Sequence, residues 1–492
     1  LEEAKKAGEQ AVAIDPRLLK LNKSLENWSK ETQQFHKQDS ISTPSLPEKY
    51  HPKIDCIANE QKLIESNVIG YDAFWPYPAI TEKHAYDMAK KYLRGYDQSV
   101  VYFGFPWATL IDQFLHKPEN TKHLLLELEK YKPYLKQFRK VVTVCQHVHL
   151  LKYQYLFGEV GITDIFWSHA IKNQPTLPEF EKISIHPFPL FPVQATDVSP
   201  QQLTGIFRKF LFCFVGAKSQ SYYLSDSRNQ IIKHLSSDKR GVIRSRETWH
   251  YQKIVYEYQI KQNILDDKDL VDQSPTSEFK EILKQSVFSL CPSGSGPNSI
   301  RLWESIGYGS IPVVLSDTYL PPGDLDLWES AVVVCPEQSD EIKALPERLL
   351  RLNQDQSLLR QKQSALQELW ERYGVDCFIY DIIRFFRCQG QFQEVDQKAA
   401  SVLGLEKQDF PPREITKLLD PFYHWYLKID KNPDNYWLYW RLGNALVNQN
   451  LLDHGLVFYK IGLKINPNNY ELNLQLGKVL LLRNKFDRAL LY

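Results

Sequence analysis

The chain has 492 residues, of which 43% are hydrophobic and 24% charged, a balance typical of a globular protein with room for about three domains. Its 60 basic and 59 acidic residues give a net charge of +1, which excludes a global electrostatic preference for nucleic acid or an anionic membrane. Seven cysteines without a CxxC pair, and no apolar run of about eighteen residues, predict buried thiols, no transmembrane segment and a cytoplasmic location.

The chain is expected to begin with helix and a linker. Residues 1–36 have a helical character, and the run Glu9-Gln-Ala-Val-Ala-Ile-Asp-Pro16 parallels a segment near the other end of the chain. Residues 37–50 are polar and contain two prolines, which predicts a linker.

A first α/β domain is expected over residues 51–192. Apolar runs alternate with helical stretches such as 82–94 and 119–137, and this alternation predicts a parallel sheet. The expected strands are 99–103, 141–145, 164–167 and 183–185. A proline-rich run over 185–192 interrupts the pattern and is interpreted as a hinge.

A second α/β domain is expected over residues 193–354, with a ligand at the carboxyl ends of its strands. Its expected strands are 210–215, 286–291, 311–315 and 331–335, and its expected helices are 226–236, 276–285, 299–307 and 341–353. Residues 355–420 are interpreted as a helical segment, packing back across the domains, followed by a linker.

The last region, residues 421–492, contains a repeat. The pattern Asn-Pro-x-Asn-Tyr starts at Asn432 and again at Asn466, 34 residues later, and a Leu-Gly pair follows each copy. This period resembles the tetratricopeptide repeat, which would imply a protein partner; the alternative is that these helices only pack on the catalytic body.

The segment from Phe288 to Asp317 predicts a strand, a glycine-rich turn, a short helix and a second buried strand. Gly294 and Gly296 let the backbone approach a ligand, Pro297 suits the first helical position, and Asn298 and Ser299 can satisfy free amides. The amides from Ser293 to Ser299 provide the helix end for a phosphate clamp. Such a helix start favours an anion. The Walker pattern and the third glycine of the dinucleotide fingerprint are both absent, and an ordinary turn is the alternative.

The same segment, Cys-Pro-x-Gly-x-Gly-Pro-Asn-Ser-x-Arg-Leu-Trp-Glu followed by Ile-Pro-Val-Val-Leu-Ser-Asp, is similar to the donor-binding signature of exostosin-like glycosyltransferases, glycosyltransferase family 47. The resemblance implies two facing Rossmann-like domains, the glycosyltransferase-B architecture, with an acceptor-side domain first and a donor-binding domain second. It also implies a UDP-sugar donor and no metal or other cofactor. Eukaryotic members of the family are usually membrane-anchored Golgi enzymes.

The donor diphosphate needs a cationic clamp. Arg228, near the start of the helix after the strand that ends at Gly216, matches an arginine common in the family and could bind phosphate oxygens in a bidentate manner. Lys218 and Arg301 are second candidates, and an exposed solubilising charge is the alternative. The resemblance assigns Glu304 to the ribose hydroxyls; the alternative is a surface salt pair with Arg301.

An acceptor hydroxyl needs a general base. Family members often have a strand that ends in His-Asp, and the resemblance places His147 at the histidine, with Val148 in place of the aspartate. His149 adds an imidazole on the same side of an extended strand. The rivals are Asp112, placed in a loop, together with Asp164 and His169, while His186 is interpreted as structural or donor-lining.

Two further patterns have weaker meaning. Asp324-Leu-Asp326 has the form of a metal-binding DxD motif, but it fits a family loop without a metal role. The aromatic residues within 71–77 and 103–107 could stack on sugars or belong to the core.

These features predict an inverting glycosyltransferase that moves a sugar from a nucleotide donor to a glycan or another hydroxyl acceptor. The alternatives are a degenerate enzyme that acts as a scaffold through its repeats, and a nucleotide-sugar hydrolase.

Overall fold

The computed structural model describes residues 66–203, 205–247, 255, 273–389, 425, 428–429, 432–448 and 450–483. All of them belong to one compact unit, Glu60–Tyr492. The expected helix over 1–36, the linker over 37–50 and the segment 390–420 lie outside the described residues, and the domain limits stay predictions.

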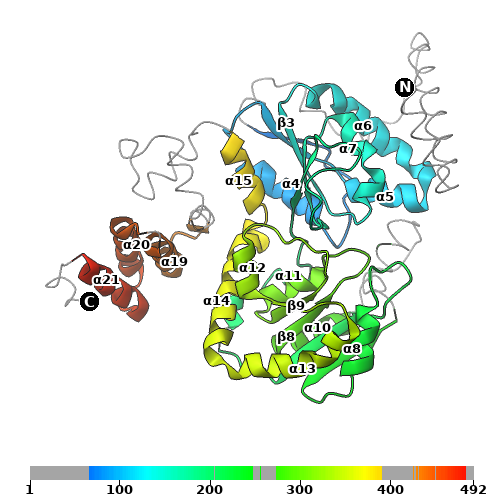
Figure 1. Cartoon of the computed structure of the whole chain (residues 1–492). Helices are drawn as coiled ribbons and strands as arrows, with labels where there is room; N and C mark the ends of the chain where they lie inside the picture. The colour runs from blue at the N-terminus through cyan, green and yellow to red at the C-terminus, as the bar shows by residue number, and fades with distance from the viewer. Residues whose placement is uncertain are drawn as a thin grey trace, which may run out of the picture. The chain divides into compact units, whose positions relative to one another are not determined.

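The first sheet is parallel and has the strand order β1-β2-β3-β4-β5. Its strands are β1 (Val68–Gly70), β2 (Val100–Gly104), β3 (Lys140–Cys145), β4 (Asp164–Trp167) and β5 (Ser184–Pro187). Its helices are α4 (Thr81–Tyr92), α5 (Trp107–His116), α6 (Thr121–Leu135) and α7 (Tyr155–Val160). Figure 1 labels strand β3 of this sheet and the helices α4, α5, α6 and α7 around it. The prediction missed β1, because this edge strand is only three half-buried residues long.

The second sheet is also parallel, with the order β10-β9-β8-β6-β7. Its strands are β6 (Phe210–Ala217), β7 (Gly241–Arg246), β8 (Ser286–Pro292), β9 (Ile311–Leu315) and β10 (Val333–Val334). Its helices are α8 (Ser227–Leu235), α10 (Gln273–Lys284), α11 (Ile300–Gly307), α12 (Leu325–Ala331) and α13 (Ser339–Gln354). The prediction missed β7, whose outer half is polar.

Both faces of the first sheet are buried, as the near-continuous apolar runs of its strands require. Val101 and Phe103 pack toward α5 and α6, whereas Val100 and Tyr102 belong to the core of the other face. Helix α15 (Tyr380–Gln389) packs on that other face through Ile382 and Phe386, although it comes late in the chain. Two parallel α/β sheets confirm the predicted α/β class and are compatible with two Rossmann-like domains.

The last described helices are α19 (Tyr436–Asn448), α20 (Leu452–Ile465) and α21 (Tyr470–Leu482). A Cβ atom on Gly443 would come within 2.4 Å of the Tyr459 ring, so glycine is needed where α19 approaches α20. Arg441 of α19 donates a 2.8 Å hydrogen bond to buried Glu371 of α14 (Gln356–Tyr373). This ion pair joins the helices to the α/β body, whereas their tetratricopeptide character stays a prediction.

Candidate active site

The glycine-rich loop connects β8 to α11 at the carboxyl edge of the second sheet. The amide of Gly294 donates to the carbonyl of Gly296, which closes the turn. The helix begins at Ile300, so the expectation that Pro297 would occupy the first helical position is wrong. The reason is that Ser299 is extended and stands at the N-cap position, where its side chain makes no capping hydrogen bond. The amides at the start of α11 therefore lack a side-chain acceptor from Ser299.

Asn298 links this loop to the first sheet. Its Oδ1 accepts hydrogen bonds from the amide of Ser299 and from Nε1 of Trp303, and its Nδ2 donates to the carbonyl of Ser168 at 2.7 Å. Because Ser168 follows the last residue of β4, the carboxyl edges of the two sheets meet at this point.

Arg228 lies in the first turn of α8 and is buried, not an exposed solubilising charge. Its Nε donates to the carbonyl of Ser293 at 2.9 Å, its Nη1 donates to that of Ala217, and the guanidinium lies over the Tyr223 ring. Burial, followed by the nearby Arg301 charge, lowers its pKa to about 10. No described carboxylate forms a salt bridge with Arg228. The glycine loop therefore has a buried guanidinium beside it whose charge is not neutralised by an ion pair.

Arg301 brings a second guanidinium to the same place. Its Nη2 donates to the carbonyl of Val215, while Nε and Nη1 are buried without a hydrogen-bond partner among the described residues. A Cβ atom on Gly216 would come within 2.3 Å of Nη2, so the glycine that ends the apolar part of β6 makes room for this side chain. Burial lowers the pKa of Arg301. Two partly desolvated cations with spare donors favour an anionic ligand.

Lys218 differs from both arginines, because it is exposed and pairs with the exposed carboxylate of Glu247 at 2.7 Å. This geometry fits an exposed charge that keeps the surface soluble, which was the alternative to a phosphate contact for Lys218.

Glu337 is a residue of this edge that the sequence analysis missed. Its Oε1 accepts hydrogen bonds from the hydroxyls of Ser225, at 2.5 Å, and Ser293, at 2.6 Å, and its Oε2 accepts from the amide of Asp317. The carboxylate thus connects the loops after β6, β8 and β9. Its position just after the strand β10 was the available signal, since ligand-side residues of parallel sheets lie at the carboxyl ends of strands.

Glu304 is buried in α11, so it is not a surface salt pair with Arg301. Its Oε1 accepts a 3.0 Å hydrogen bond from the amide of Gln194, in the segment that leads from the first sheet to the second. Burial raises its pKa to about 7, although the Gln194 amide and the Arg301 charge oppose the shift. Its contact with ribose stays a prediction.

The raised pKa of Glu304 predicts a pH-dependent stability. The carboxyl group of Glu304 keeps its proton up to about pH 7 in the folded protein but only up to about pH 4.5 in the unfolded chain. The stability that this difference in pKa gives the folded state is therefore fully present below pH 4.5 and is lost as the pH rises through 7. Relative to Glu304→Gln, which keeps an oxygen for Gln194, the wild type should lose about 1.4 kcal/mol of unfolding free energy per pH unit within this window. Urea unfolding at pH 5, 6, 7 and 8 measures it, with the exposed Glu329→Gln as control; a pH-independent difference would contradict the prediction.

The base candidates gather at the carboxyl edge of the first sheet. His147 Nε2 lies 3.1 Å from Asp112 Oδ1, and His147 Nδ1 accepts the amide of His149. Because Nδ1 is an acceptor, Nε2 carries the proton and donates it to Asp112. Asp112 lies on α5 and not in the expected loop.

The extended strand expected through His149 ends at Cys145, because the hydrogen bond from the His149 amide to His147 closes a local turn. The two imidazole rings still lie side by side, 5.5 Å apart. Burial, followed by the His147 and Lys152 charges, lowers the pKa of His149.

His169 joins this group from the end of β4. It is buried, and a Cβ atom on Gly296 would come within 2.3 Å of its Nδ1 and 2.8 Å of Val148. The glycine at 296 therefore lets the glycine-rich loop pack directly on His169 and Val148. Burial, with the neighbouring His147 and His149, lowers the pKa of His169 to about 3, and its Nδ1 has no described partner.

Glu82 holds the two segments that carry the base candidates Asp112 and His147. Its buried carboxylate accepts hydrogen bonds from the amide of Gln146, the residue before His147, and from the amide of Ala108, one turn before Asp112 on α5. Burial raises its pKa to about 8 in spite of these amides. Glu82 therefore fixes the α5 start against the loop after β3.

Asp164 and His186 lie elsewhere. Asp164 begins β4, at the opposite end of the strand from His169, and accepts hydrogen bonds from His186, Lys140 and Thr163. Burial would raise its pKa, but these three partners lower it. Asp164 is buried and His186 is partly exposed, so the pair is a structural contact at the start of β4.

The structure also places the DxD motif and the aromatic residues that the sequence analysis named. Asp324 caps α12 by accepting the amide of Asp326, which explains a helix where a loop was expected. Phe103, Phe105 and Trp107 are core residues, whereas Phe74 and Tyr77 are exposed.

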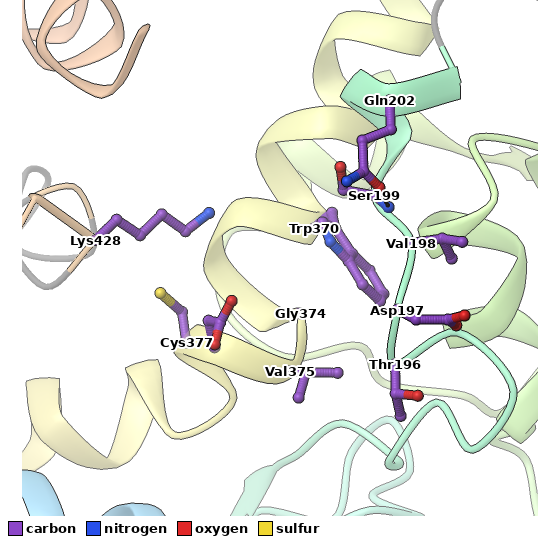
Figure 2. A pocket seen from close by; sticks show the side chains of 11 residues that line it. Thr196, Asp197, Val198, Ser199, Gln202, Trp370, Gly374, Val375, Cys377 and Lys428 are labelled. Carbon is purple, nitrogen blue, oxygen red and sulfur yellow. Dashed lines mark hydrogen bonds between the residues drawn. The ribbon is translucent and has the colours of Figure 1, made fainter. Parts of the chain in front are cut away.

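A pocket of about 310 Å³ lies apart from this edge (Figure 2). Figure 2 shows Lys428 reaching toward the Trp370 side of the pocket from a separate segment. None of the predicted site residues lines it. Its lining consists of Thr196, Asp197, Val198, Ser199, Gln202, Trp370, Gly374, Val375, Asp376, Cys377 and Lys428.

The fold and the site define a class: an α/β protein with two parallel sheets and buried guanidinium groups at a glycine loop. Residues 151–349 match the Exostosin GT47 domain. This match includes Arg228, the glycine loop and Glu304, but begins after Asp112, His147 and His149.

Curated relatives agree with this match. The chain is 29% identical to Exostosin-1a of Danio rerio over 168 residues, which are 34% of this chain and 22% of the relative. It is 28% identical to the Exostosin-1 homolog of Caenorhabditis elegans over 144 residues, 29% of this chain and 35% of the relative. It is 31% identical to Probable glucuronosyltransferase 47 A of Physcomitrium patens over 98 residues, 20% of this chain and 21% of the relative. The alignments span only about a fifth to a third of these relatives, and they support glycosyltransferase activity of exostosin type.

The expected cytoplasmic location is wrong, because the exostosin relatives are Golgi-resident type II membrane proteins. Scattered cysteines reflect the packing of thiols and not the compartment: of those described, only Cys388 is exposed. Among the described helices, none is long and apolar enough to cross a membrane.

Proposed function

We propose that this chain is an inverting glycosyltransferase that transfers a sugar from a UDP-linked donor to a hydroxyl group of a glycan. The observation that carries the proposal is a pair of buried guanidinium groups, Arg228 and Arg301, beside the glycine loop of the segment that matches the exostosin domain. Neither group forms a salt bridge with a described carboxylate. The spare donors of both side chains, with the amides at the start of α11, suit a diphosphate.

The proposed reaction uses the two sheet edges together. Asp112, oriented by the Nε2–H of His147, takes the proton of the acceptor hydroxyl. The acceptor oxygen bonds to the anomeric carbon as the bond from that carbon to the phosphate oxygen breaks, and UDP leaves with the electron pair. Arg228 and Arg301 stabilise the charge that develops on the diphosphate, so the proposed reaction needs no metal ion. Glu304 remains the proposed contact of the ribose.

The test is a UDP-release assay on the full chain, with and without chelator, using UDP-glucuronate, UDP-N-acetylglucosamine, UDP-galactose and UDP-xylose. Release that requires an oligosaccharide acceptor and resists chelator would support the proposal. Release without an acceptor would indicate a hydrolase instead. If calorimetry detects no binding of UDP, the transferase proposal fails and a scaffold role for α19–α21 becomes the better explanation.

A further inference from the structure

An aromatic loop follows β1 on the first sheet. Phe74 is 56% exposed and Tyr77 is 54% exposed. Single exposed rings are common on protein surfaces, so exposure alone has little meaning. The anchoring of this loop distinguishes it.

The loop is fixed by several polar contacts. Asp72 forms salt bridges with Lys83 at 2.9 Å and Lys90 at 2.8 Å, both on α4, and accepts a hydrogen bond from Nε1 of Trp75. Trp75 stacks on Tyr86 with ring centroids 5.5 Å apart. Because the carboxylate of Asp72 is neutralised by two lysines, the loop presents its rings without an unpaired acidic charge.

Phe74 has an unusual backbone conformation. Its φ angle of 59° is in the left-handed region, which bulky L-residues rarely adopt. Its carbonyl accepts a 2.6 Å hydrogen bond from the hydroxyl of Thr109. Such strained residues persist where the surroundings hold them, and they are frequent at ligand sites.

The Phe74 ring has Tyr71 and His123 as ring neighbours. The ring lies parallel to Tyr71, with an interplanar angle of 10°, and contacts His123 with centroids 5.3 Å apart. The hydroxyl of Tyr71 is hydrogen-bonded to Nε2 of His123 at 2.7 Å. Tyr71 and His123 thus hold the Phe74 ring in place while more than half of this residue stays exposed.

The backbone of this loop is attached close to the proposed base. Thr109, which binds the Phe74 carbonyl, and Asp112 are three residues apart on α5. Side chains at this spacing are neighbours on a helix surface, with Cβ atoms about 5–6 Å apart. The aromatic loop is therefore attached one helical turn from Asp112.

We infer that Phe74, together with Tyr77, forms an acceptor subsite that stacks on the apolar face of a sugar ring one or two units from the reacting hydroxyl. The subsite accepts a neutral glycan ring, because aromatic faces attract the polarised C–H groups of a pyranose. The one charged side chain within residues 71–80, Asp72, is already paired with Lys83 and Lys90, so the loop has no free charge for an ionic group. The identity of the acceptor rests on the proposed transferase function.

The test measures glycan binding to the full chain without donor. Cellohexaose and chitohexaose are titrated into the wild type, Phe74→Ala and Phe74→Trp, with saturation-transfer NMR and calorimetry as readouts. The matched control is Tyr134→Ala, since Tyr134 is an exposed aromatic residue at the other end of α6 from His123. Phe74→Ala should weaken binding at least tenfold, Phe74→Trp should retain it, and Tyr134→Ala should leave it unchanged.

The outcomes separate this inference from the transferase proposal. Unchanged hexasaccharide binding in Phe74→Ala, or no binding of either hexasaccharide to the wild type, overturns the subsite. A change in sedimentation of Phe74→Ala with unchanged glycan binding also overturns it and indicates self-association. Loss of glycan binding in Phe74→Ala, in a chain that binds no UDP, supports the subsite while the transferase proposal fails. Near-ultraviolet circular dichroism confirms that each variant is folded.

Discussion

Replacing Arg228 by alanine is expected to weaken UDP binding by about two to four orders of magnitude. A bidentate contact supplies two charge-assisted hydrogen bonds of about 1.5–3 kcal/mol each, and each factor of ten is about 1.4 kcal/mol. The effect should be large because the guanidinium is buried beside Ser293 and has no carboxylate partner among the described residues. Isothermal titration calorimetry of UDP measures it.

The controls for Arg228 separate charge, geometry and folding. Lys218→Ala removes an exposed charge that already pairs with Glu247, so its dissociation constant should stay within about twofold of the wild type. Arg228→Lys keeps the charge without the planar fork and should lie between, about tenfold weaker. Because Arg228 also holds the carbonyls of Ser293 and Ala217, thermal unfolding is measured for each variant. Wild-type affinity in a folded Arg228→Ala protein would contradict the clamp.

The second large effect is expected at Asp112. Asp112→Asn should lower kcat about 10²- to 10⁴-fold, the usual contribution of a general base, and leave the affinity for UDP unchanged. The reason is that the asparagine amide cannot take the proton of the acceptor hydroxyl. The UDP affinity should not change, because Asp112 makes no described hydrogen bond to the glycine-rich loop. Initial rates at saturating donor, with UDP titrations alongside, measure the two quantities separately.

Two companion variants identify the role of the pair. His147→Gln can still donate an N–H to Asp112 and should lose about tenfold in kcat, less than Asp112→Asn. Asp87→Asn, on the exposed side of α4, is the matched control and should keep wild-type rates. If His147→Gln is the more damaging variant, the base is the imidazole and not the carboxylate.

The strands in both cores were predictable from local pattern. Four predicted strands agree with β3, β4, β8 and β9 within about a residue: 141–145, 164–167, 286–291 and 311–315. They could be predicted because strands that are covered on both faces have mostly apolar sequences. The edge strands β1 and β7 were missed because they are short or half polar, and their pairing depends on a neighbour far along the chain.

The sequence by itself determined the α/β class and the glycine loop before α11, since both depend on residue types within a few positions of one another. Only the tertiary structure decided which charges are buried and which groups meet. Arg228 is buried against Ser293, 65 positions later in the chain. Asp112 meets His147 only because α5 and the loop after β3 both begin at the same sheet edge. Gly296 packs on His169 for the same reason. Burial and pairing of this kind are set by contacts between distant segments, and no local pattern encodes them.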